Sequence, residues 1–114
     1  MHEFSLAEGV LEIVLDTARD NSLTSVADVR LDVGKLSGVS IDAVRFAWEF
    51  LSNEHDLTKG AQLSVNEPPG RGLCQHCGFD GPIDNYLRIC PSCGGGGLRF
   101  TSGEEFTVTG ITGE

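Results

Sequence analysis

Residues 72–98 read GLCQHCGFDGPIDNYLRICPSCGGGGL, and this stretch decides how the C-terminal half of the chain folds. It holds all four cysteines of the chain, in two C-x-x-C pairs formed by Cys74, Cys77, Cys90 and Cys93. Two residues between paired cysteines let a tight turn aim both sulfur atoms at one ion, and two such turns complete a tetrahedral site. Gly78 and Gly94 each follow the second cysteine of a pair. The tight turn around each pair, here called a knuckle, requires a backbone conformation at that position that glycine adopts easily. The stretch therefore predicts a four-cysteine metal site.

Four thiolates leave no open coordination position, so we expect a structural zinc ion and not a catalytic one. The span 78–89 has the length of a zinc-ribbon hairpin. Its low apolar content predicts that the metal supplies the folding energy of the ribbon. The same sulfur geometry could hold iron, as in a rubredoxin-like electron carrier. A ribbon that binds nucleic acid is a third hypothesis.

Charge and cysteine usage limit the function classes. The chain has 114 residues and a formal net charge of −9, from 17 acidic and 8 basic residues. This balance repels phosphate backbones and anionic membrane surfaces, so we expect neither a nucleic acid nor a membrane as a partner. No secretory segment opens the sequence, and no apolar run approaches the roughly 20 residues of a spanning helix. We therefore expect a cytoplasmic protein whose paired thiols bind metal.

Outside the cysteine region, helical periodicity predicts two helices. Ser5 and Glu8 form a capping box at the start of the first, and its apolar face is expected to hold Leu6, Val10, Ile13, Val14 and Thr17. We expect Ser40 to be the N-cap of the second helix, with Asp42 in the first turn. That helix should end near Asn53. We expect its whole apolar content to be core: Ile41, Val44, Phe46, Ala47, Trp48, Phe50 and Leu51.

Alternation of apolar and polar residues predicts three strands, centred on residues 29–33, 61–65 and 106–111. The order is then helix, strand, helix, strand, cysteine module and strand. It predicts an α+β fold, with two helices packed on a three-stranded sheet and an inserted zinc-ribbon module. We expect one domain from residues 1–67 and 101–114, and a zinc-binding domain from residues 68–100. No Ser/His/Asp or paired-carboxylate arrangement stands out, so we predict no catalytic residues.

The chain begins Met1-His2-Glu3. A free α-amine and the His2 amide nitrogen close a five-membered chelate ring on a metal, and the His2 imidazole closes a six-membered one. Such nitrogen ligands suit square-planar Ni(II) or Cu(II). A lone histidine at a chain end is usually solvated, however, so the residues alone leave both readings open.

Four stretches resemble the HypA/HybF family of hydrogenase nickel-incorporation proteins: MHEFSL at 1–6, VGKLSGV at 33–39, FAWE at 46–49 and KGAQL at 59–63. The resemblance covers nearly the whole chain in the right order. It implies a nickel metallochaperone that is not an enzyme, with a nickel-binding α/β domain and an inserted zinc domain. Such a protein acts with the GTPase HypB on the large subunit of [NiFe]-hydrogenase, and urease is a second candidate recipient.

The family pattern also implies site residues. His2 would ligate nickel, with the Met1 amine and the backbone at Glu3 assisting. The four cysteines match the zinc ligands of the family. Some relatives carry histidines beside both cysteine pairs, whereas only His76 lies in the module here. We expect His76 to point to solvent, with a role as an extra nickel ligand as the alternative, and His55 to be a polar helix end.

Overall fold

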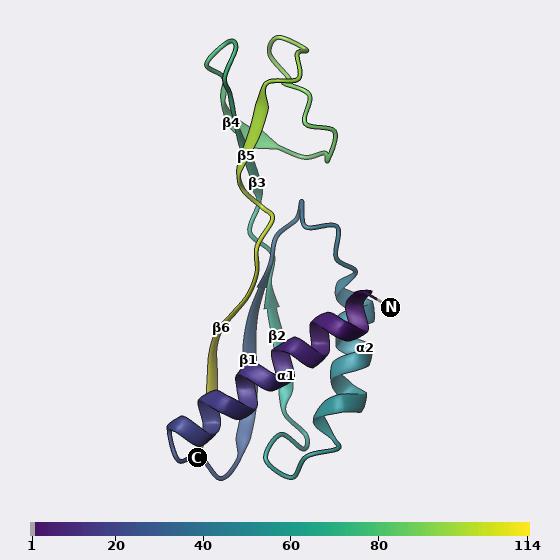
Figure 1. Ribbon diagram of the computed structural model, residues 1–114, viewed down its shortest axis with the longest axis vertical. Coiled ribbons are helices and arrows are strands. Elements are labelled where there is room, and N and C mark those ends of the chain that lie inside the picture. Colours follow the sequence, from purple (N-terminus) through teal and green to yellow (C-terminus); the bar gives the residue numbers. More distant parts are fainter. Residues whose placement is uncertain (1) are drawn as a thin grey trace. The chain divides into compact units, whose positions relative to one another are not determined.

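The computed structural model describes residues 2–114, which form two compact units (Figure 1). The first, called the helical unit here, holds the described residues up to Leu31 together with Val39–Val65 and Thr107–Glu114. The second, the cysteine unit, holds Asp32–Gly38 and Asn66–Phe106.

The helical unit contains the two predicted helices, α1 (His2–Asp20) and α2 (Ile41–Ser52), which pack against each other. A three-stranded sheet has the order β2-β1-β6, from strands β1 (Val26–Val33), β2 (Gln62–Asn66) and β6 (Phe106–Gly113). The predicted α+β architecture of two helices and a three-stranded sheet is therefore confirmed. The core is formed by apolar side chains of both helices and of β1, among them Val10, Val14, Val29, Leu31, Val44, Trp48 and Leu51.

The start of α2 agrees with the prediction, whereas the start of α1 does not. Ser40 is the N-cap of α2, and its hydroxyl accepts a hydrogen bond from the Ala43 N–H at 3.3 Å. Helix α1 begins at His2, so Ser5 lies inside the helix and not at its cap. Glu3 supplies the acidic side chain that favours a helix start, since a carboxylate in the first turn interacts well with the unpaired N–H groups there.

Three residues expected in the core are exposed. The exposed fractions are 51% for Ile13, 78% for Phe46 and 59% for Phe50. Val44 and Trp48 point into the core, and each phenylalanine follows one of them by two residues, which is about 200° around a helix. The face opposite the core is thus partly aromatic, a fact that composition alone did not reveal.

Gly9 offers a stability test within α1. A Cβ atom added at Gly9 would meet nothing within 4 Å. We expect Gly9→Ala to raise the free energy of unfolding by about 0.5–1 kcal/mol, because alanine loses less backbone entropy in a helix. Gly60→Ala is the matched control and should lower the free energy of unfolding, because Gly60 has a φ of +78°, which is strained for alanine. Denaturant titration followed by fluorescence of the buried Trp48 measures both, and a destabilising Gly9→Ala would contradict the packing described.

The cysteine unit is built on a second three-stranded sheet with the order β4-β3-β5. Strand β3 (Gly70–Cys74) pairs antiparallel with both β4 (Asp80–Ile83) and β5 (Leu98–Ser102). The β3–β4 hairpin carries the first cysteine pair at its turn. Three apolar side chains and two of the cysteines form a small buried cluster: Leu36, Ile83, Leu98, Cys74 and Cys90.

Leu36 explains why residues 32–38 belong with the cysteine unit. Its side chain is buried in that cluster, and its N–H donates to the Gly103 carbonyl at 2.7 Å. The Gly34 N–H likewise donates to the Glu105 carbonyl at 2.8 Å. These contacts lie within the compact unit that holds the cysteines, which includes residues 32–38 and 101–106.

Candidate metal centre

The four cysteine sulfur atoms lie within 4.8 Å of one another. The Sγ atoms of Cys74 and Cys93 are 3.8 Å apart, and those of Cys77 and Cys90 are 3.5 Å apart. A tetrahedral ion with metal–sulfur bonds of about 2.3 Å places its ligands about 3.8 Å apart. The sulfur cluster therefore has the size of a tetrahedral thiolate site, and the donor set fits zinc.

Both cysteine pairs adopt the same local structure. The N–H of the residue four positions after the first cysteine donates to that cysteine's carbonyl, from Gly78 to Cys74 at 3.0 Å and from Gly94 to Cys90 at 2.9 Å. Both glycines have positive φ angles, 80° and 73°, which side chains with a Cβ rarely adopt. The expected need for glycine after each pair is confirmed.

The two knuckles also close in the same way. The N–H of the first cysteine in each pair donates to the carbonyl of the residue five positions later. The two distances are 2.8 Å from Cys74 to Phe79 and 3.0 Å from Cys90 to Gly95. The first pair is therefore hydrogen-bonded to the residue before β4, whereas the second pair is hydrogen-bonded to the glycine run that precedes β5. The glycine run at 94–97 is thus part of the site.

Backbone N–H groups point at the sulfur atoms of the second pair. Ser92 and Cys93 both donate to the Cys90 Sγ at 3.4 Å, and Gly95 donates to the Cys93 Sγ at 3.4 Å. Burial raises the pKa of the Cys90 thiol, but the N–H groups of Cys93 and Ser92 outweigh it and lower the pKa to about 7. The arrangement favours a thiolate at this position.

The first pair contains one favoured and one disfavoured thiolate. N–H groups of Cys77 and His76 hold the pKa of Cys74 below its usual range. For Cys77, the Phe79 N–H lowers the pKa, but the hydrogen bond with the Cys90 sulfur and burial outweigh it and raise the pKa to about 11. A cation that binds all four sulfurs must displace the remaining protons, so its affinity falls as the pH falls.

His76 lies at the edge of the cluster and is exposed, as expected. Its imidazole packs against Gly97 and leaves no room for a side chain at that position. A Cβ atom added at Gly97 would lie 2.1 Å from the His76 Cδ2 atom. The Gln75 N–H donates to the Gly97 carbonyl at 3.0 Å. Gly97 therefore brings the second knuckle's exit close to the first, a role that no motif in the sequence predicted.

At the other predicted site, His2 is the first residue of α1 and is exposed. Met1, the predicted amine ligand, lies outside the described residues. The Glu3 carboxylate accepts hydrogen bonds from its own N–H and from the Ser40 N–H, at 3.4 Å for the latter, and both lower the pKa of Glu3. The contact ties the start of α1 to the cap of α2, which sequence reasoning missed. His55, the remaining histidine, is exposed in the turn that follows α2.

A family profile described as "Hydrogenase/urease nickel incorporation, metallochaperone, hypA" matches residues 1–113. The chain belongs to the HypA family. The hydrogenase maturation factor HypA of Rhizobium leguminosarum bv. viciae is 41% identical over 108 residues, which cover 95% of each chain. Its counterpart in Azoarcus sp. (strain BH72) is 40% identical over 108 residues, which cover 95% of this chain and 94% of the relative.

Solved HypA structures have the same fold. The solution structure of the Ni metallochaperone HypA from Helicobacter pylori aligns with a TM-score of 0.73 at 18% identity, over 97% of this chain and 96% of that one. A second HypA solution structure gives a TM-score of 0.74 at 20% identity, over 100% and 97% of the two chains. The family is thus one of metallochaperones in hydrogenase maturation. In the described part of this HypA-family chain, no helix combines the length and apolar character needed to cross a membrane.

Proposed function

We propose that this HypA-family protein is a non-enzymatic metallochaperone that binds Ni(II) at its N-terminus and delivers it for maturation of [NiFe]-hydrogenase. Membership of the family over residues 1–113 is the observation that carries the proposal. The family description names urease beside hydrogenase, so a urease is a second candidate recipient.

The start of α1 supports nickel binding at His2, with Met1 and Glu3 as the assisting residues. The first N–H groups of a helix have no acceptor within the helix, so the His2 amide nitrogen is not committed to a main-chain hydrogen bond. The exposed imidazole is free to turn toward the same ion. Nitrogen donors on adjacent residues form the chelate that Ni(II) prefers in square-planar geometry. At Glu3 we assign the backbone nitrogen and not the side chain, so the N–H would give up its hydrogen bond to the Glu3 carboxylate.

We propose that the four-cysteine cluster binds a resident zinc ion through Cys74, Cys77, Cys90 and Cys93. When bound, the ion supplies folding free energy to the cysteine unit and performs no reaction step. The buried cluster around Leu36 is too small to replace it. This proposal assigns nickel to the domain predicted at residues 1–67 and 101–114, and zinc to the domain predicted at 68–100.

The proposed partners are a HypB-type nickel-insertion GTPase and the large subunit of the hydrogenase, and the proposed location is the cytoplasm. Four unpaired thiols support a reducing compartment. The net charge of −9 supports a protein partner over a nucleic acid or an anionic membrane.

Replacing the proposed nickel ligand in cells tests delivery. We expect His2→Ala to leave the protein folded but to reduce hydrogenase activity about tenfold or more at limiting nickel. High nickel in the medium should restore part of the activity by mass action. The measurement is hydrogenase activity in cells that carry each variant, with protein levels checked by immunoblot.

His55→Ala is the matched control, because it removes an exposed histidine of the same unit. It should behave like the wild type at both nickel concentrations. Full hydrogenase activity in cells that carry His2→Ala at limiting nickel would contradict the proposal that His2 serves nickel delivery.

A further inference from the structure

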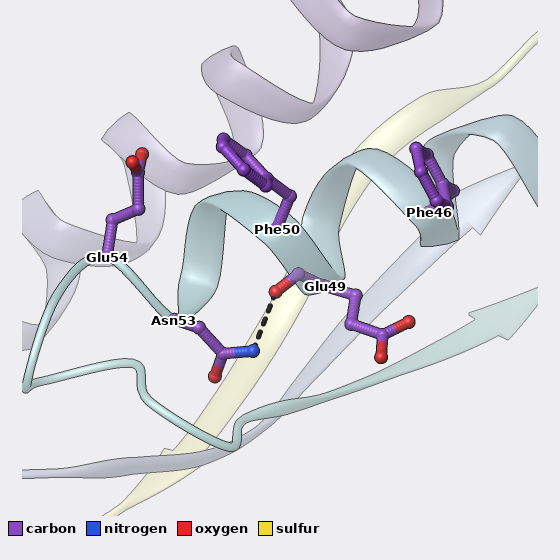
Figure 2. A pocket seen from close by; sticks show the side chains of 5 residues that line it. All are labelled: Phe46, Glu49, Phe50, Asn53 and Glu54. Atoms are coloured by element: carbon purple, nitrogen blue, oxygen red, sulfur yellow. Dashed lines mark hydrogen bonds between the residues drawn. The ribbon is translucent and has the colours of Figure 1, made fainter.

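Two phenylalanines stand exposed on α2, four residues apart. The exposed fractions of Phe46 and Phe50 are 78% and 59%. Residues four apart are neighbours on a helix surface, and Figure 2 shows both rings projecting from the same side of α2. They line an open pocket together with Glu49, Asn53 and Glu54.

Folding of the helical unit does not account for these rings. The core-facing stripe of α2 is already complete, since Val44, Ala47, Trp48 and Leu51 are all buried. Phenylalanine has no advantage over a polar residue at an exposed helix position, and it carries an aggregation risk there. An aromatic pair kept on the solvent side is typical of a contact surface.

The edge of this surface is negatively charged. Asp42 lies four residues before Phe46, Glu54 lies four residues after Phe50, and Glu49 lies between them. Among residues 2–114, no cation lies within salt-bridge distance of these three carboxylates. Arg45 precedes Glu49 by one turn, but its guanidinium donates to the Leu63 carbonyl. The surface is therefore an aromatic ridge beside unbalanced acidic groups.

We propose that this surface, the α2 aromatic face, docks an amphipathic helix of a partner protein that presents apolar side chains flanked by Lys or Arg. The face consists of Phe46 and Phe50 with Asp42, Glu49 and Glu54. An i, i+4 ridge packs into the groove of another helix, and basic flanks complement the three carboxylates. A second copy would bring like charges together on a chain of net charge −9, and an anionic membrane is repelled in the same way. The proposal does not depend on either metal site.

A pair of synthetic peptides tests the docking chemistry. Both are fluorescein-labelled helices of about 18 residues, or five turns, with one leucine stripe. One carries lysine beside the stripe, and the other carries glutamate at the same positions. We expect the lysine peptide to bind at least about tenfold more tightly by fluorescence anisotropy, with an affinity that falls as salt rises.

Variants show where the lysine peptide binds. Phe46→Ser combined with Phe50→Ser should weaken it about tenfold or more, and Glu49→Gln combined with Glu54→Gln should remove the preference for lysine. Leu87→Ser is the matched control, because Leu87 is 72% exposed in the cysteine unit. Fluorescence of Trp48 verifies that the helical unit, which carries the α2 aromatic face, is folded in each variant. Equal binding of the two peptides, or equal loss in Leu87→Ser, would overturn the proposal.

Cross-linking in cells tests which molecule binds the α2 aromatic face there. A photoreactive p-benzoylphenylalanine is placed at position 46, and at position 87 for comparison. The proposal requires a cross-link specific to position 46, in a segment with apolar residues and flanking Lys or Arg. A cross-link to a second copy of this chain, to lipid or to an acidic segment would overturn it, as would the absence of any cross-link specific to position 46.

Discussion

A protein carrying Cys74→Ser should lose its zinc and the fold of the cysteine unit, while the helical unit stays folded. Cys74 is buried and its sulfur lies 3.8 Å from that of Cys93, so the change removes one of four converging ligands. Binding of a structural zinc is worth about 10–16 kcal/mol of apparent free energy at neutral pH, which exceeds the stability that most domains possess. We expect zinc content to fall from one per chain to near zero, measured by elemental analysis.

The chain contains one natural reporter for each unit. Its single tryptophan, Trp48, is buried in the helical unit, and its single tyrosine, Tyr86, lies in the cysteine unit. In Cys74→Ser, Trp48 fluorescence should remain native, whereas amide hydrogen exchange in β3, β4 and β5 should become fast. Ser92→Ala is the control, since Ser92 lies between two ligands and contributes only its backbone N–H to the site.

Two outcomes would contradict this account of the centre. A Cys74→Ser protein with full zinc content would show that the sulfur cluster does not hold the ion. Purified wild-type protein that is red with iron and free of zinc would support the rubredoxin-like alternative, because the sulfur geometry suits both metals.

The parts of the fold that could be predicted are those specified by local sequence. The C-x-x-C spacing predicted the sulfur cluster, and the glycines after each pair predicted the positive φ angles at Gly78 and Gly94. The Ser40 cap and the apolar stripe of α2 followed from capping chemistry and helical periodicity. In these cases the structural cause lies within a few residues of its effect.

The parts that could not be predicted depend on distant contacts. Leu36 is buried beside Ile83 and Leu98, residues that lie far along the chain, so the boundary of the cysteine unit is invisible to local patterns. The exposed side of α2 was misjudged because Phe46 and Phe50 are apolar, and composition does not say which face a helix buries. The start of α1 depends on Glu3, whose carboxylate meets the Ser40 N–H.

The second large effect concerns nickel. Adding Gly-Ser before Met1 should lower the nickel affinity about a hundredfold or more, which corresponds to about 2.8 kcal/mol. The extension moves the imidazole to the fourth position and removes the free amine next to it, so the five-membered ring is lost and the amine, amide and imidazole can no longer chelate one ion together. The core side chains of α1 are unchanged, and the fold should therefore survive. The same two residues added after Glu114 are the control, because they lengthen the chain without altering its N-terminus.

Calorimetric titration of Ni(II) into zinc-loaded protein compares the native chain with these two extended forms. It tests most directly the claim that the N-terminus binds the cargo metal. We predict tight binding of one nickel ion per chain in the native form and in the form extended at its C-terminus, and at least about a hundredfold weaker binding in the form extended at its N-terminus. Equal nickel affinity in all three forms would contradict the account and would make His76 the next candidate ligand.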